Sequence, residues 1–318
     1  MDSSAGFIKV KLLACEEWPC ENLGTRRGSP ERVKMLALIF GLGAAVAWAV
    51  HDLMVRRYAQ GAAVLPLLLV VAITGCLALT VPATIWGAWD RMTPAAYGFA
   101  AATGGVYILG MFGLYAAFRL APVRVVAPVL GSFPLISLGI AAFQGRAVHP
   151  SEWMAVAAIV IGIAVVAMLS RAEEGDAPVR LGPALGWALV GAAGFAVTFA
   201  LGQQAALIGD ALPAILVARL VAATGIAALA LATRAPVAEV RGALPALALM
   251  GVLDALALGL VQAAASLPHP EYAAITASLF GVLTIFLAWS VLGERVKPLQ
   301  WLGIAIVFAG VAVLSAQE

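Results

Sequence analysis

Long apolar runs alternate with short polar breaks along most of the chain. Ten runs approach the roughly 20 mostly apolar residues that a helix needs to cross a hydrocarbon core of about 30 Å. They cover residues 35–55, 64–86, 97–118, 123–143, 152–170, 183–207, 213–233, 243–265, 272–292 and 298–315. The breaks are short and contain Gly, Pro and polar residues, so consecutive helices are expected to be antiparallel. A membrane β-barrel would instead show segments of about ten residues with alternating apolar and polar positions.

Composition supports this interpretation and excludes several classes of protein. Of the 318 residues, 63% are hydrophobic and 11% are charged, against about 25% charged residues in soluble proteins. The net charge is +2 and the basic residues are scattered, which argues against a nucleic-acid partner. Cys15, Cys20 and Cys76 form no disulfide framework or CxxC zinc pair. We predict an all-α polytopic membrane protein with ten transmembrane helices, no metal and no cofactor.

Two polar segments divide the chain. Residues 1–34 form a polar tail with six basic and five acidic residues, and we hypothesise that the physiological start is Met35. The polar stretch 171–182 follows the fifth run and is expected to be a linker. It separates a first five-helix repeat, 35–170, from a second one, 183–318.

The two halves repeat each other in sequence. At an offset of 147 or 148 residues, the matched pairs are Trp48 with Phe195, His51 with Thr198, Pro66 with Pro213, Gly104 with Gly251, Pro150 with Pro298, Trp153 with Trp301 and Gly162 with Gly310. Because five is an odd number, two such repeats joined by a short linker must cross the membrane in opposite directions. Inverted repeats are typical of secondary transporters that work by alternating access to a site near the midplane.

Three segments carry a resemblance to a known family. They are AAVAWAVHD around Trp48, YAAFRLAPVRVVAPVLGSFPLISL from Tyr115, and GERVKPLQWLGIAIVFAGV from Gly293. With the span count, they resemble the drug/metabolite transporter (DMT) superfamily and, within it, the ten-span EamA family, from residue 35 to the end. The resemblance implies a multi-pass carrier of the cell inner membrane for small metabolites, often an exporter of amino acids or related compounds.

The chain departs from that family in the first half. The Gly-Glu pair usual after the fourth span is Gly145-Arg146 here, whereas Gly293-Glu294 retains it in the second half. Orientation stays open as well. The odd-numbered loops hold ten Lys and Arg residues and the even-numbered loops hold two, which places the odd loops in the cytoplasm. The basic tail and the family resemblance both favour cytoplasmic termini.

Few ionisable residues lie inside the predicted spans, where each costs about 2.5–3.5 kcal/mol at the bilayer centre and needs a partner, a cavity or a function. In the first span Trp48 and Asp52 share a helix face, with His51 one position round. Arg219 lies inside the seventh span, and Asp254 lies near the middle of the eighth.

Two polar stripes match between the halves. They comprise Gly251, Asp254, Leu258 and Gln262 in the eighth span and, 147 residues earlier, Gly104, Tyr107, Met111 and Tyr115 in the third. We expect them to form opposite walls of one cavity whose substrate-contacting residues are Trp48, His51, Asp52, Tyr107, Tyr115, Thr198, Arg219, Asp254 and Gln262. A simpler interpretation stays open for each group of residues. Arg219 and Asp254 could form a buried ion pair that only fixes two helices. His51 and Asp52 could lie at the headgroup level of the membrane.

The fourth span contains helix-breaking residues. Pro128 and Pro134 remove two backbone donors six residues apart, with Gly131 between them, so this helix should be kinked or locally opened. Gly281 lies in the matching stretch of the ninth span. We hypothesise that both spans line the pathway and bend during the access switch. Static kinks filled by neighbouring side chains are the alternative.

These features favour a secondary active transporter, exporting a small metabolite such as an amino acid. The chain has no GxxxxGK[ST] phosphate loop, so uphill transport would draw on an ion gradient. Asp254, Asp52 and His51 are the candidates to carry a proton, and Arg219 suits an anionic substrate group. A channel or uniporter is the alternative. A membrane-embedded enzyme is disfavoured because no catalytic motif is found. The expected partners are the substrate, protons and lipid, and a monomer or a homodimer fits equally.

Overall fold

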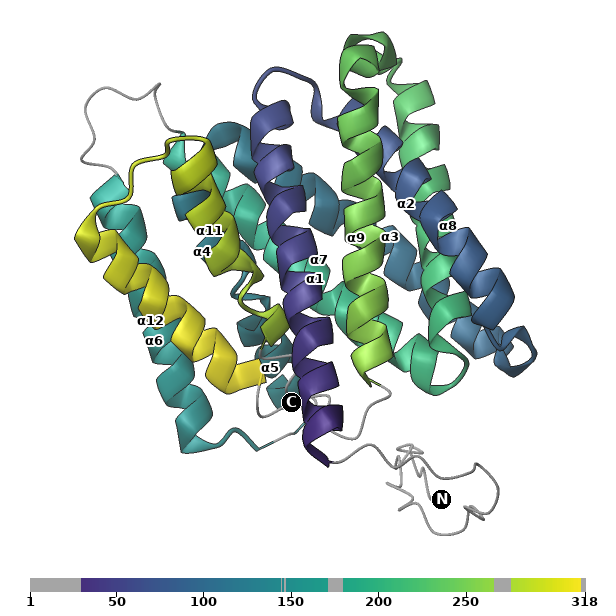
Figure 1. Cartoon of the computed structure of the whole chain (residues 1–318), viewed down its shortest axis with the longest axis horizontal. Coiled ribbons are helices and arrows are strands. Elements are labelled where there is room, and N and C mark those ends of the chain that lie inside the picture. Colours follow the sequence, from purple (N-terminus) through teal and green to yellow (C-terminus); the bar gives the residue numbers. More distant parts are fainter. Residues whose placement is uncertain (1–29, 144, 146, 171–179, 266–275, 316–318) are drawn as a thin grey trace, which may run out of the picture.

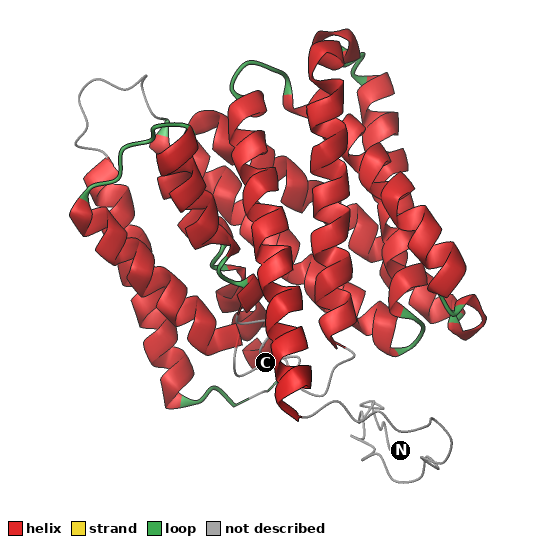
Figure 2. Cartoon of the chain, in the orientation of Figure 1, coloured by secondary structure: helices red, strands yellow, loops and turns green. Residues whose placement is uncertain are grey.

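The computed structural model describes residues 30–143, 145, 147–170, 180–265 and 276–315. This described part is built from helices and contains no strand (Figure 2). The α-helices are α1 (Pro30–Ala59), α2 (Val64–Trp86), α3 (Pro94–Leu120), α4 (Val123–Leu130), α5 (Phe133–Phe143), α6 (Pro150–Ser170), α7 (Leu181–Leu207), α8 (Ala211–Ala232), α9 (Leu244–Ala265), α11 (Phe280–Val291) and α12 (Pro298–Ser315). Two short 3-10 helices, η1 (Trp89–Arg91) and η2 (Val237–Ala243), precede α3 and α9.

The lengths and hydropathy of these helices confirm an all-α polytopic membrane protein. Within the described residues, seven helical stretches are long and apolar enough to cross a bilayer, and three shorter apolar helices cover Pro150–Val166, Phe280–Val291 and Pro298–Leu314. Together they correspond to the ten predicted runs. Large apolar side chains such as Leu77 and Trp86 are 64% and 72% exposed on the outside of the bundle, as expected where lipid replaces water.

Helix boundaries add detail to the predicted spans. Helix α1 begins at Pro30, within the polar tail, and its apolar span starts at Met35 as predicted. The fourth span is two helices, because α4 ends at Leu130 and α5 begins at Phe133. Pro134 is the second residue of α5, where a missing backbone N–H breaks no helical hydrogen bond. The first residues of the predicted ninth span lie outside the described part, and α11 begins at Phe280.

Helix contacts follow the predicted repeat. If the second half repeats the first, a contact between α3 and α7 requires one between α9 and α1, and both are observed. The contact of α2 with α9 is matched in the same way by that of α8 with α3. The pairs α2–α8 and α6–α12, which such a two-fold relation maps onto themselves, also pack together (Figure 1). This pattern supports the proposal of two inverted five-helix repeats.

Glycines at matched positions allow two of these contacts. A Cβ on Gly104 of α3 would collide with the backbone oxygen of Ala218 on α8, and a Cβ on Gly251 of α9 would lie 2.5 Å from the backbone oxygen of Val71 on α2. Gly104 and Gly251 are 147 residues apart, and so are their contact residues Val71 and Ala218. The two glycines that the sequence places on the walls of the cavity therefore serve helix packing.

Replacing Gly104 with Ala is expected to lower stability by about 1–3 kcal/mol, because the added methyl group has to push α3 away from α8. Thermal unfolding of the purified protein measures this change. Gly105→Ala is a matched control, since a Cβ on Gly105 has open space within 4 Å. Equal unfolding temperatures for the two variants would contradict the close approach of α3 and α8.

Candidate functional site

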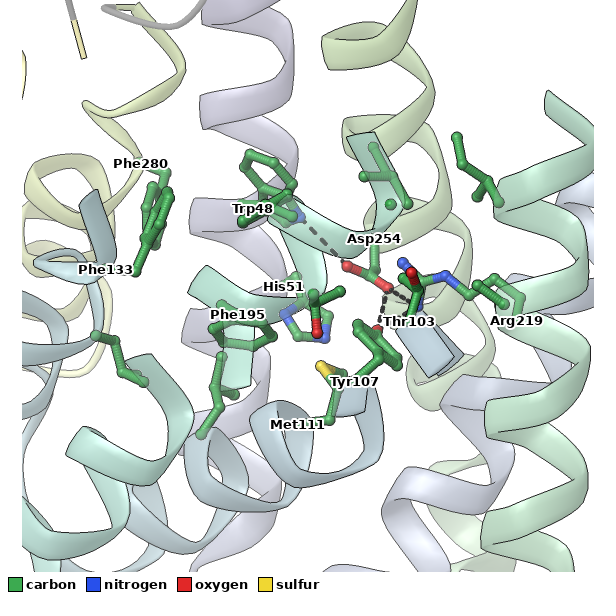
Figure 3. Close-up of a pocket in the computed structure, with 18 of the residues that line it drawn as sticks. Trp48, His51, Thr103, Tyr107, Met111, Phe133, Phe195, Arg219, Asp254 and Phe280 are labelled. Atoms are coloured by element: carbon green, nitrogen blue, oxygen red, sulfur yellow. Dashed lines mark hydrogen bonds and ion pairs between the residues drawn. The ribbon is translucent and has the colours of Figure 1, made fainter. Parts of the chain in front are cut away.

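A cavity lies among the helices near the middle of the bundle (Figure 3). Helices α1, α3, α4, α5, α7, α8, α9 and α11 contribute to its lining, so both halves build it. The cavity and its opening together hold about 1010 Å³ of empty space. Of the predicted substrate-cavity residues, the lining contains Trp48, His51, Asp52, Tyr107, Thr198, Arg219 and Asp254. The structure thus brings together seven side chains from five helices that are far apart in the sequence.

Asp254 is the centre of a polar cluster. Its Oδ1 accepts a hydrogen bond of 3.2 Å from Trp48 Nε1, and its Oδ2 accepts one of 2.7 Å from Tyr107 Oη (Figure 3). Arg219 Nη1 lies 2.6 Å from Asp254 Oδ2 and also donates to Tyr107 Oη. Asp254 and Arg219 are 6% and 5% exposed. The predicted buried ion pair is therefore present, and it lies in the wall of the cavity, so the two interpretations of these residues do not exclude each other.

His51 and Asp52 form a second polar pair on α1. His51 Nδ1 is 3.0 Å from Asp52 Oδ1, and His51 Nε2 is 3.4 Å from Tyr115 Oη. Both residues of the pair are 2% exposed and both line the cavity, which excludes the alternative that they lie at the headgroup level. A neutral imidazole with its proton on Nδ1 would donate to Asp52 and accept from the phenol, satisfying all three groups.

The rest of the lining is mostly aromatic and aliphatic. Ring centroids of Trp48 lie 6.5 Å from Phe199 and 5.9 Å from Phe280, and those of Phe133 and Phe199 are 5.2 Å apart. These four rings form one aromatic cluster at the cavity. These three phenylalanines, and Phe195 elsewhere in the lining, were not predicted as site residues, because an aromatic residue inside an apolar span gives no signal of its own. The repeat offset, which matches Trp48 with Phe195 and Asp52 with Phe199, points to two of them.

One predicted site residue with a described side chain, Tyr115, is not part of the lining. Tyr115 is fully buried behind the cavity, where it contacts His51. Gln262 is on α9, but its side chain is outside the described part of the structure. Among the described residues of the two predicted stripes, Tyr107, Met111, Asp254 and Leu258 line the cavity, whereas Gly104, Tyr115 and Gly251 do not.

Comparisons with known proteins agree with this architecture. Residues 182–316 match the EamA-like transporter family. The second half of the chain is therefore similar to the EamA-like transporter family. This family consists of membrane transporters of small solutes and belongs to the DMT superfamily, which agrees with the resemblance seen in the sequence. The matched residues nearly coincide with the second of the two predicted five-helix halves.

One solved structure supports the fold of this EamA-like protein over most of its length. A crystal structure of a protein, 19% identical in sequence, aligns with 87% of this chain and 95% of its own chain at a TM-score of 0.57. It is one of 27 matching chains of solved structures. At this identity the likeness shows the fold alone. No curated protein matches the sequence.

The hinge residues of the EamA-like chain meet one aromatic ring. Added Cβ atoms on Gly131 and Gly281 would lie 3.0 Å and 2.7 Å from Cε1 of Phe308 on α12. The break between α4 and α5 thus packs against the same side chain as the start of α11. Close packing accounts for both glycines in this conformation. The bending of these helices during transport remains a proposal.

An ion pair joins three parts of the EamA-like bundle away from the cavity. We call the side that carries the α1–α2, α3–α4, α8–α9 and α11–α12 connections the odd-loop face, and the opposite side the even-loop face (upper and lower in Figure 1). On the odd-loop face, Arg56 Nε is 3.0 Å from Glu294 Oε1. Arg56 Nη1 also donates to the backbone oxygen of Phe118 at 2.7 Å, and Glu294 Oε2 accepts from the backbone N–H of Val123 at 2.9 Å.

This Arg56–Glu294 latch ties the end of α1 to the α3–α4 connection and to the segment after α11. The cavity extends the other way. Its lining includes Ala214 in the first turn of α8, where that helix leaves the even-loop face, and Gly202 near the end of α7. From the sequence, Glu294 is recognisable only as a feature of the resembled family, because its partner is 238 residues away.

Proposed function

We propose that the chain is a secondary carrier that moves a small amphipathic metabolite by alternating access in the cell inner membrane. One observation carries this proposal. A buried polar cluster in a central cavity faces one side of the bundle, while the Arg56–Glu294 latch holds the other side together. A carrier needs such a barrier on one side at a time. Because family members are transporters, we further propose that the chain has no enzymatic activity.

The finer parts of the proposal rest on different grounds. Export, and an amino acid or related amine as substrate, follow from the family resemblance. Coupling to protons is supported by His51 and Asp52, since both are buried at the cavity and both can bind a proton. Asp254 is a weaker candidate for proton transfer, because three donors already satisfy its carboxylate. The two glycine-containing breaks near Phe308 would allow the fourth and ninth spans to bend.

Counterflow in proteoliposomes tests the carrier mechanism. Vesicles loaded with an unlabelled solute are diluted into a trace of the same labelled solute, using a panel of amino acids and small amines. A carrier is expected to accumulate label transiently, because its binding site reorients across the membrane more readily with bound solute than without it. A channel or uniporter pore dissipates both pools and shows no accumulation. Repeating the assay with and without a pH gradient tests proton coupling, and label that equilibrates without an overshoot would contradict the carrier.

A further inference from the structure

The formal charges around the cavity do not balance. Arg219 is compensated by Asp254, to which its guanidinium is hydrogen bonded. Asp52 is the second carboxylate of the lining, and within the described residues its one ion-pair partner is His51. With a neutral His51 and an ionised Asp52, the cavity wall therefore carries one uncompensated negative charge. A guanidinium that already serves a carboxylate and a phenol is poorly placed to bind an anionic substrate.

A buried carboxylate requires a positive partner, because burying an isolated charge is costly. Asp52 is 2% exposed, so bulk water cannot supply this compensation. Asp52 can bind a proton itself, His51 can carry one, or a ligand in the cavity can bring a positive charge. These solutions exclude one another, since one carboxylate binds one proton or compensates one positive charge.

The surroundings of Asp52 suit an organic cation. The four-ring aromatic cluster of Trp48, Phe133, Phe199 and Phe280 offers apolar surface and ring faces, which attract ammonium groups. Thr198, at the position that matches His51 in the other half, has a buried hydroxyl oxygen without a hydrogen-bond partner. It lines the same cavity and could accept a hydrogen bond from an N–H group.

We infer that this cavity takes a monovalent primary ammonium ion with an apolar or aromatic body, in preference to a zwitterion or an anion, with Asp52 as its counter-ion. The inference rests on the proposed function, because it names the substrate class of the carrier's site. A proton held by the His51–Asp52 pair competes with the ligand. His51 contacts Asp52 on α1 and Tyr115 on α3, and Tyr107, Arg219 and Asp254 line the same cavity. Arg219 already compensates Asp254, so Asp52 is the carboxylate that remains for the ligand.

Three probes with the same phenyl body separate the charge classes. They are 2-phenylethylamine (a cation), L-phenylalanine (a zwitterion) and phenylacetate (an anion), titrated calorimetrically into the purified full-length protein. The amine is expected to bind at least tenfold more tightly than the other two. Its affinity should fall as the pH is lowered, because a proton on the His51–Asp52 pair then takes the place of the amine, while the amine itself remains charged. Equal or tighter binding of L-phenylalanine or phenylacetate, or no binding of the amine at millimolar concentration, overturns the inference.

Variants assign the effect to the proposed pair. Asp52→Asn should weaken amine binding at least tenfold, and Asp52→Glu should retain most of it. His51→Gln should still bind the amine, because it leaves the carboxylate of Asp52 in place. Asp90→Asn, which changes an exposed carboxylate of η1, is the control and should bind like the unmodified protein. If Asp52→Asn does not fold, the Glu variant and the probe series still decide. An amine affinity unchanged in a folded Asp52→Asn protein overturns the inference.

Transport of the same probes separates this inference from the proposed function. If the amine binds as expected but gives no counterflow, the carrier proposal fails and the ligand class stands. If L-phenylalanine or phenylacetate gives counterflow while the amine neither binds nor exchanges, the carrier proposal stands and the ligand class fails.

Discussion

Replacing Asp254 with Asn is expected to destabilise the protein by about 3–5 kcal/mol and to abolish solute exchange. The large effect arises because Arg219 would remain buried without a counter-charge, which costs far more than the hydrogen bonds that are lost. Arg219→Gln should cost a similar amount for the converse reason. Thermal unfolding of the purified variants, with counterflow in proteoliposomes, measures both consequences.

The double variant separates structure from function. Removing both charges, as in Arg219→Met with Asp254→Leu, leaves no buried ion uncompensated and should recover most of the stability. Exchange should remain absent, since Asp254 also orients Trp48 and Tyr107 at the cavity. If the two single costs simply add in the double variant, the residues do not act as a pair. If the double variant transports normally, the pair is only a scaffold.

Breaking the Arg56–Glu294 latch is expected to open the odd-loop face. The pair is largely buried, with side chains 14% and 11% exposed, so salt screens it weakly. A charge-assisted hydrogen bond contributes about 1.5–3 kcal/mol, and 1.4 kcal/mol corresponds to a tenfold change in an equilibrium constant. Glu294→Gln should therefore raise the population open on this face about tenfold or more.

Double electron–electron resonance, which measures the distance between two spin labels, would detect this opening. Labels attached at Arg57→Cys and Leu299→Cys, both exposed near this face, should show one distance in the protein with an intact latch. Glu294→Gln or Arg56→Gln should add a longer distance, and the double variant should open no further than either one. Glu239→Gln, at an exposed carboxylate of η2 on the same face, is the control. Unchanged distances in all latch variants would contradict a gating role.

The latch also makes the two faces unequal. By the repeat offset, Arg56 corresponds to Gln203 and Glu294 to Arg146. An amide and a guanidinium cannot form the equivalent ion pair on the even-loop face, whatever the position of Arg146, which lies outside the described residues. In the proposed carrier, closure of the odd-loop face is therefore stabilised by an ion pair that closure of the even-loop face lacks, so the two access states differ in free energy.

The spans, the repeat and the packing glycines were readable from the sequence because each depends on local or periodic information. A segment must be apolar along its own length to lie in lipid, and this property does not depend on its neighbours. The polar residues Trp48, Asp52, Arg219 and Asp254 were also identifiable, since a polar side chain in an apolar run has to be explained. The break at Gly131 was predicted from the two prolines beside it.

Tertiary structure alone decided which of these residues meet. Trp48 binds Asp254 across 206 residues of chain, and Arg56 reaches Glu294 across 238. Such contacts depend on the angles and distances at which helices pack, and hydropathy does not encode them. The same packing placed Gly104 and Gly251 between helices instead of on the cavity wall, moved Tyr115 behind His51, and brought four phenylalanines to the cavity. Sequence therefore determined which groups must avoid lipid, and packing determined whether each found a partner, a cavity or both.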